Sequence, residues 1–168
     1  MRTCIYNKNN NKLNKQKLMT NKQKCVALLF LAFFCFSLSA EYLSVGVDQA
    51  FLHEAPSDST KKTFIVTKGY PLEVIVSLKE WKKVKDHQGA INWIPSNHLS
   101  SKKMVLNFKA NNPIHLEPND SSPTLAFVAE NVVLEIVDNK RIDNWIKVYS
   151  KSTEVEGFIS IENLWGIK

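Results

Sequence analysis

An internal repeat constrains this chain more than any other feature of its sequence. Four motifs built on apolar and aromatic residues occur twice in the same order, and corresponding positions lie 62 to 65 residues apart. This spacing predicts a duplicated small module, and duplicated modules of this size commonly serve as binding units. The first copy contains Leu72–Ile75, Trp81–Val84, Asn92–Ile94 and Leu99, and the second contains Leu134–Val137, Trp145–Val148, Gly157–Ile159 and Leu164.

The first forty residues have the layout of a secretory signal peptide. A basic, polar stretch precedes the apolar run 26–36, and small residues follow it as far as Ala40. The run is too short for a helix that spans a membrane, and cleavage is expected after Ala40. We therefore expect an exported protein, periplasmic or extracellular, with no stable membrane span after cleavage; Met19 is an alternative start of translation.

Removal of this leader changes the charge of the chain. The leader holds seven of the 22 basic residues and none of the 16 acidic ones, which leaves 15 basic against 16 acidic groups. This near balance gives no support for binding of nucleic acid. The three cysteines, Cys4, Cys25 and Cys35, also lie in the leader, so the mature chain is expected to have no disulfide, thiolate metal site or cysteine nucleophile.

The mature chain divides at the polar stretch around residues 100–103. We expect one domain at 41–102 and a second at 103–168, each built from short strands without helical periodicity. Five short strands in about 60 residues commonly curl into a small barrel, because closure removes unpaired edges. The expected strands are 42–47, 63–67, 72–78, 81–85 and 90–94 in the first domain, and 104–108, 125–128, 132–137, 145–149 and 155–159 in the second.

The order of these motifs resembles the bacterial SH3-like domain family of envelope proteins. The resemblance implies an all-β fold of two tandem SH3-like barrels in an exported protein without an assigned enzymatic role, and a contact with peptidoglycan. Where the family usually has arginine this chain has His53 and His115, so a ligand contact through that arginine is not carried over. The resemblance rests on Leu52–Ser57, Lys68-Gly69, Trp81–Val84, Trp93-Ile94 and Leu99, and again on Ile114–Pro118, Leu134–Ile136, Trp145–Val148, Gly157–Ile159 and Asn163–Gly166.

Alternation along the strands yields a candidate binding surface. If Val84 and Val148 point into the barrels, the tryptophans and neighbouring lysines lie outside, a composition suited to stacking on sugars or apolar groups. Two alternatives remain, in which a bulge turns each tryptophan inward or the two copies bury these rings against each other. The candidate ligand-binding residues are Trp81, Lys83, Trp93, Trp145, Lys147 and Phe158.

No catalytic or metal-binding constellation is recognisable in the sequence. His53 and His115 occupy matching places, but neither has a second ligand at suitable spacing, so we expect surface or half-buried strand residues rather than metal ligands. Motifs for nucleophilic catalysis, phosphate binding or zinc hydrolysis do not occur. We therefore expect no enzyme, no cofactor and no metal.

The expected function is a non-catalytic, exported binding module that contacts peptidoglycan in the bacterial envelope. The main alternative is a protein-interaction adaptor for an envelope enzyme or receptor, without wall binding. A third hypothesis, a secreted effector, needs only the same signal peptide. The sequence alone does not separate these three.

Overall fold

The computed structural model describes residues 40–167, and by its contacts the segment Ala40–Lys168 forms one compact unit. The predicted signal peptide and the predicted alternative start at Met19 lie outside the described residues, apart from Ala40. Across the described part of the chain, no helix is long and apolar enough to cross a membrane. The only helical segments in residues 40–167 are two short 3-10 turns, η1 (Ser96–His98) and η2 (Ile161–Asn163).

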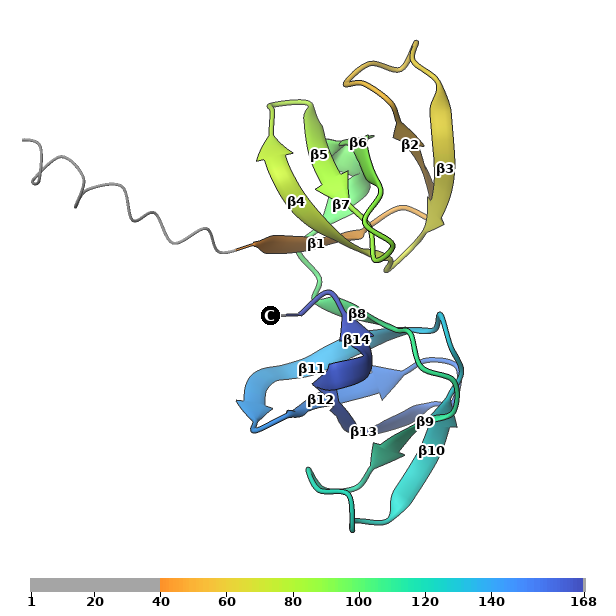
Figure 1. Cartoon of the computed structure of the whole chain (residues 1–168), viewed down its shortest axis with the longest axis vertical. Coiled ribbons are helices and arrows are strands. Elements are labelled where there is room, and N and C mark those ends of the chain that lie inside the picture. Colours follow the sequence, from red (N-terminus) through yellow and green to blue (C-terminus); the bar gives the residue numbers. More distant parts are fainter. Residues whose placement is uncertain (1–39, 168) are drawn as a thin grey trace, which may run out of the picture. The chain divides into compact units, whose positions relative to one another are not determined.

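Seven antiparallel strands form the first sheet (Figure 1). Their order across the sheet is β3-β2-β6-β5-β4-β1-β7, so each strand except the two at the ends has two neighbours. The strands are β1 (Glu41–Val45), β2 (Gln49–His53), β3 (Lys62–Thr67), β4 (Pro71–Ser77), β5 (Trp81–Lys85), β6 (Ile91–Pro95) and β7 (Leu99–Ser100).

The second sheet repeats the first strand by strand. Its order is β10-β9-β13-β12-β11-β8-β14, which is the order of the first sheet with seven added to every label. The two copies therefore share one topology as well as a sequence pattern. The strands are β8 (Met104–Asn107), β9 (Asn112–His115), β10 (Thr124–Val128), β11 (Val133–Ile142), β12 (Trp145–Ser150), β13 (Val155–Ser160) and β14 (Leu164–Trp165).

The all-β prediction is confirmed, with two differences in detail. In the described residues, no ladder joins β3 to β7 or β10 to β14, so each sheet curves without closing through hydrogen bonds. The two-residue strands β7 and β14 were absent from the prediction, and so were the longer strands β2 and β9. Their sequences explain this, because β9 contains Pro113, which normally argues against a strand, and β2 contains the weak strand former Ala50.

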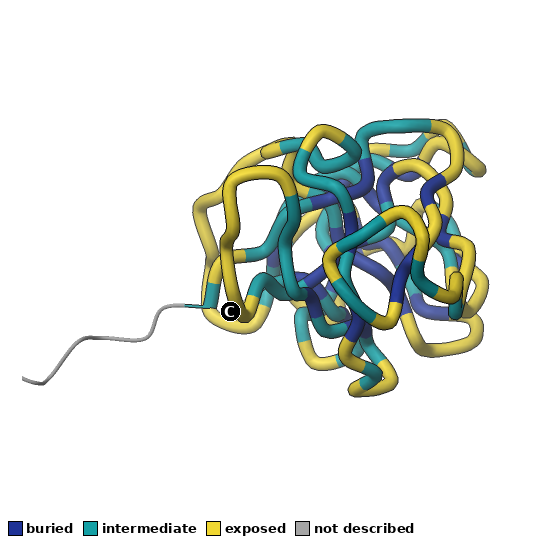
Figure 2. The backbone as a smooth tube through the Cα atoms, turned by 90° about the horizontal axis from the view of Figure 1, so that it is seen from above, coloured by how far each residue is buried: buried dark blue, intermediate teal, exposed yellow. Residues whose placement is uncertain are grey.

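Each sheet encloses a separate apolar core. Buried residues alternate with more exposed ones along several strands, most regularly in β6 and β12. Figure 2 shows buried stretches of the backbone toward the interior and exposed stretches toward the outside. The first core contains Val45, Ala50, Leu52, Val66, Leu72, Val84 and Ile94, and the second contains Val105, Ile114, Val128, Leu134, Ile146, Val148, Ile159 and Leu164.

Residues from the two sheets also touch one another within the compact unit. The rings of Tyr42 and Trp165 meet edge to face, with centroids 5.5 Å apart. The ammonium of Lys85 lies 5.6 Å from the centroid of Trp165, and a Cβ atom built on Gly166 would lie only 2.7 Å from the Cβ of Pro71. Burial of apolar surface in the two cores, supplemented by these contacts, holds the described residues together.

We expect Ile94→Ala to destabilise the fold by about 2–5 kcal/mol, because this fully buried side chain fills the first core and its removal leaves a cavity. Ile91→Ala, on the same strand, is the matched control. Ile91 is 53% exposed, so its truncation should change the free energy of unfolding by less than about 0.5 kcal/mol. Urea denaturation measures both, and similar losses for the two variants would contradict the assigned inward face of β6.

Candidate functional site

The two predicted tryptophans lie on the outward face of their strands. Val84 is buried in the first core and Val148 in the second, whereas Trp81 and Trp145 are each half-buried. The ladder between β5 and β6 runs without a register shift, and so does the ladder between β12 and β13. The ladders on the other side, β4–β5 and β11–β12, do contain register shifts, but the extra residues lie in β4 and β11. A bulge in β5 or β12 that turns the tryptophan inward is therefore wrong.

In each sheet the tryptophan packs against a histidine of the same sheet rather than against the other copy. The rings of Trp81 and His53 meet edge to face with centroids 5.1 Å apart, and those of Trp145 and His115 do so at 5.3 Å. The alternative in which the two copies bury these rings against each other is therefore wrong. Each ring keeps part of its surface in solvent.

The two histidines differ from their predicted environment. We expected surface or half-buried side chains, but His53 is 3% exposed and His115 is 6% exposed. Each histidine packs edge to face against the outward tryptophan of its sheet, and His115 Nδ1 also lies 2.9 Å from the Ser122 carbonyl in the loop that follows it. Strand alternation predicts the face of a residue but not what packs against it, which is why burial was missed.

The predicted site residues come together as two separate clusters. In the first sheet Lys83 pairs with Trp93 across the ladder, Trp93 pairs with His53, and the Lys83 ammonium lies 5.9 Å from the centroid of Trp93. In the second sheet Lys147 pairs with Phe158, and Phe158 pairs with His115. Each histidine cluster thus consists of a histidine, a tryptophan, a lysine and a further aromatic ring: His53, Trp81, Lys83 and Trp93, or His115, Trp145, Lys147 and Phe158.

The lysines of the two clusters have different partners. Lys83 makes no ion pair within residues 40–167, whereas the Lys147 ammonium lies 2.6 Å from the Glu156 carboxylate. The Glu156 carboxylate therefore compensates part of the positive charge on Lys147. An anionic ligand would find a freer lysine in the first cluster than in the second.

The loops that follow the histidines form a further repeat that the prediction used only in part. His53–Thr60 reads HEAPSDST and His115–Ser122 reads HLEPNDSS, with every position 62 residues from its counterpart. The backbone hydrogen bonds repeat as well. The amide of Ser57 donates to the Ala55 carbonyl at 2.8 Å, and the amide of Asn119 donates to the Glu117 carbonyl at 2.8 Å. Constant spacing over this loop was the signal that could have placed it in the site.

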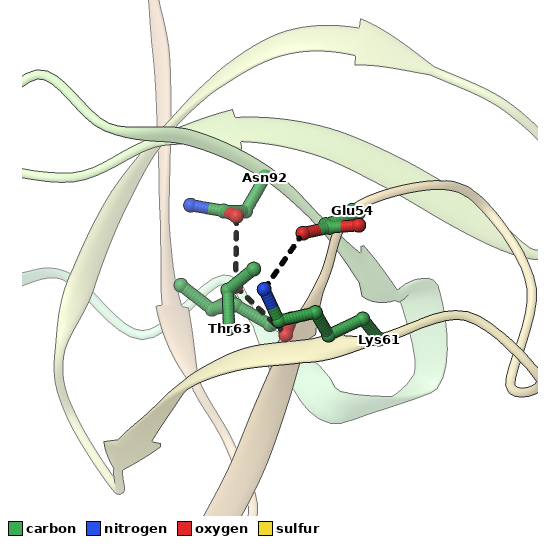
Figure 3. A network of polar contacts seen from close by, with 5 residues as sticks. Glu54, Lys61, Thr63 and Asn92 are labelled. Atoms are coloured by element: carbon green, nitrogen blue, oxygen red, sulfur yellow. Dashed lines mark hydrogen bonds and ion pairs between the residues drawn. The ribbon is translucent and has the colours of Figure 1, made fainter.

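Thr63 and Asn92 of the first sheet form a polar contact between side chains, and Figure 3 shows it. The Thr63 hydroxyl can donate to Asn92 Oδ1 at 2.8 Å or to the Leu52 carbonyl at 3.0 Å. The counterparts of Thr63 and Asn92 are Leu125 and Gly157, where a Cβ on the glycine would lie 2.6 Å from the His115 carbonyl oxygen. At these two positions the first copy has a hydrogen-bonded threonine and asparagine, whereas the second copy has a leucine and a glycine.

A small pocket of about 130 Å³ lies beside the second cluster. Its wall combines residues of β9 and β12 with the loop after His115 and the turn η2, so residues far apart in the sequence meet there. Two carboxylates and one ammonium are among the side chains. The lining includes Lys109, Pro113, His115, Asp120, Trp145 and Glu162.

The resolved pKa shifts belong to side chains outside the two clusters. Burial raises the pKa of Tyr42 and of Tyr70 above the ordinary tyrosine value. A hydrogen bond to the Glu73 carboxylate raises the pKa of Lys85. In the described part of the chain, no three histidine, cysteine, aspartate or glutamate side chains converge in a way that could hold a metal ion.

Comparison with protein families identifies the first copy. Residues 46–101 match the family described as the bacterial SH3 domain, so this part of the chain is a bacterial SH3 domain. The predicted family is therefore confirmed for the first copy. The matched range ends before the second copy, whose assignment to the family stays a prediction even though it repeats the strand order.

Solved structures similar to this chain include proteins of the NlpC/P60 group, and no curated protein sequence matches. NlpC2 from Trichomonas vaginalis is 14% identical with a TM-score of 0.34, and the match covers 76% of this chain and 48% of that one. NlpC1 from the same organism has the same identity and TM-score, with 75% and 45% covered. An NlpC/P60 family protein from Bacillus cereus ATCC 10987 is 14% identical with a TM-score of 0.34, with 74% and 56% covered. The chain thus spans about half the length of these proteins.

We expect Thr63→Val to destabilise the fold by about 1–3 kcal/mol, because it leaves the buried Asn92 without its hydrogen-bond donor. Thr67→Val is the matched control, since Thr67 lies exposed on the same strand and should change stability by less than about 0.5 kcal/mol. Thermal or urea unfolding gives the comparison. If both variants are equally stable, the Thr63–Asn92 contact contributes nothing to the fold.

Proposed function

We propose that the protein is a non-catalytic binding module, exported to the periplasm or beyond the cell, that contacts peptidoglycan. The observation that carries the proposal is the pair of repeated histidine clusters on the outward faces of the two sheets. Each presents half-buried aromatic rings beside a lysine, anchored from below by a buried histidine. Such rings can stack on sugar faces while an ammonium pairs with a carboxylate of the stem peptide.

The rigidity of this arrangement supports binding rather than simple packing. The histidine that packs against each tryptophan is almost fully buried, and the loop that follows each histidine repeats the same backbone hydrogen bonds. A ring held in one orientation loses little conformational freedom when a ligand stacks on it. The proposal of export rests on the signal peptide predicted from the sequence, and the proposal of a non-catalytic role is the prediction made from the sequence motifs.

A second candidate function is an adaptor that binds an envelope enzyme or receptor. The observation that favours it is the end strand β3, where Phe64 is 52% exposed and Ile65 is 59% exposed. A sheet edge with exposed apolar side chains can accept an extended segment of another protein as an additional strand. This function would use the edge of the sheet and leave the tryptophans free.

Co-sedimentation with purified, protein-free sacculi at two salt concentrations tests the proposal. We expect the chain from Glu41 to sediment at both, because stacking on aromatic rings is screened little by salt. The double variant Trp81→Ala/Trp145→Ala should bind about tenfold or more weakly, as expected when central aromatic contacts are lost.

Trp165→Ala is the matched control, because Trp165 is half-buried but belongs to neither cluster. It should retain binding within about twofold. Circular dichroism must show that the double variant is folded. Absence of sedimentation by the unmodified protein at either salt concentration would reject wall binding, and recovery of a specific envelope protein through β3 would then support the adaptor.

A further inference from the structure

A row of paired residues crosses the outward face of the first sheet and continues beyond the histidine cluster. Lys83 of β5 pairs with Trp93 of β6, and Trp93 pairs with His53 of β2. His53 in turn pairs with Lys62 of β3, so the row begins and ends on a lysine. Directly paired residues share one face of a sheet, and neighbouring strands lie about 4.8 Å apart, so the two lysines are about 14 Å apart along the sheet.

Phe51 extends the aromatic surface of the cluster toward β3. It lies between Ala50 and Leu52 of the first core, so its ring faces outward, where it is 38% exposed. The outward face thus carries aromatic rings on β5, β6 and β2 and a groove of about 450 Å³ at its β3 end. This groove is lined by Phe51, Lys62, Thr63, Phe64 and Ile65.

The lysines at the two ends of the row hold their ammonium groups beside aromatic rings. The Lys62 ammonium lies 4.1 Å from the centroid of Phe51, and the Lys83 ammonium lies 5.9 Å from the centroid of Trp93. Neither lysine makes an ion pair within residues 40–167. The row therefore offers two uncompensated positive charges with aromatic rings between them.

The second sheet has the same strand order but not the same row. At the end of its row Thr124 takes the place of the lysine, and Pro113 takes the place of the exposed phenylalanine. The lysine at the other end, Lys147, is paired with Glu156. The same fold therefore forms without these features, which indicates that the row of the first sheet is not needed to hold a sheet together.

The chemistry of the row selects a long anionic ligand with flat apolar faces. Ammonium groups at both ends can pair with carboxylates, and exposed aromatic rings can stack on the C–H faces of sugars. Strands β5, β6 and β2 each have two neighbouring strands, so their backbone groups are already paired and cannot bind a peptide backbone. A chain that crosses these strands must be recognised by side chains alone, which favours a chain of sugar rings over a peptide strand.

We propose that the row from Lys83 to Lys62, together with Phe51, binds a stretch of glycan strand that presents a carboxylate at each end of the row. The inference rests on the proposed function for the identity of the polymer, peptidoglycan, whose stem peptides would supply the carboxylates. It adds Phe51 and Lys62 to the predicted binding residues of the first sheet. It also makes affinity depend on the length of the glycan.

Isothermal titration of the chain from Glu41 with two soluble peptidoglycan fragments tests the proposal. One fragment is a disaccharide with one stem peptide, and the other is a tetrasaccharide with two. We expect the tetrasaccharide to bind at least about tenfold more tightly, because only this fragment supplies a carboxylate for each lysine. The double variant Phe51→Ala/Lys62→Gln should lose most of this advantage and keep its affinity for the disaccharide within about twofold.

Two matched variants make the test specific. Lys61→Gln removes a lysine next to Lys62 that is already paired with Glu54 at 3.4 Å (Figure 3), and Phe127→Ala removes an exposed ring from the end strand of the second sheet. Both variants should keep the tenfold preference for the longer fragment within about twofold. Urea unfolding of each variant shows that it is folded. Equal binding of the two fragments by the unmodified protein, or an unchanged preference in the double variant, would overturn the proposal.

Further outcomes separate this inference from the proposed function. Sedimentation on sacculi with equal affinity for the two fragments overturns the length-dependent site while wall binding stands. Competition by a short poly-glutamate peptide that equals competition by the tetrasaccharide overturns recognition of the glycan, because charge alone would then suffice. Absence of both sedimentation and fragment binding overturns both proposals.

Discussion

The two-residue period of strands β5 and β12 is the constraint on which the rest of the structure depends. Val84 and Val148 complete the two apolar cores, and the period then requires Trp81 and Trp145 to face outward. A half-buried indole on the outside of a curved sheet needs support on one side. His53 and His115 supply it, each packed edge to face against its tryptophan. The inward valines of the cores and the outward tryptophans with their histidine partners thus follow from the same alternation of side chains along β5 and β12.

Much of this arrangement could be predicted from the sequence, because it depends on patterns that repeat. Alternation gave the outward face of Trp81 and Trp145, and the two copies agreed in order and spacing. The strand containing Pro113 was missed, since proline in a strand is ordinarily an argument against it. Burial of the histidines was missed because it depends on contacts with other parts of the fold. The two-residue period of a strand predicts the face on which a side chain lies but not what packs against it.

The pocket illustrates a further limit on sequence-based prediction. Asp120 comes from a loop and Glu162 from a 3-10 turn, and neither segment has a period that relates it to Trp145 on β12. Only the three-dimensional pairing of β9, β13 and β12 brings them together. In the sequence, the repeat of His53–Thr60 in His115–Ser122 pointed to this loop. It indicated that the two loops have the same conformation, but not that the second one lines a pocket.

Duplication followed by divergence accounts for the differences between the copies. The exchange of Thr63 and Asn92 for Leu125 and Gly157 alters the layer beneath the histidine while the strand order stays the same. The two cores contain different residues and still support the same strand order. A sheet that packs on its own core therefore tolerates changes of this kind.

Backbone amide hydrogen exchange, measured with and without soluble muropeptides, tests the central claim most directly. If the two outward histidine clusters form the binding site, exchange should slow in strands β5 and β12 and in the loops 54–60 and 116–122. Slowed exchange confined to the end strands β3 and β10, or no change anywhere, would contradict the account.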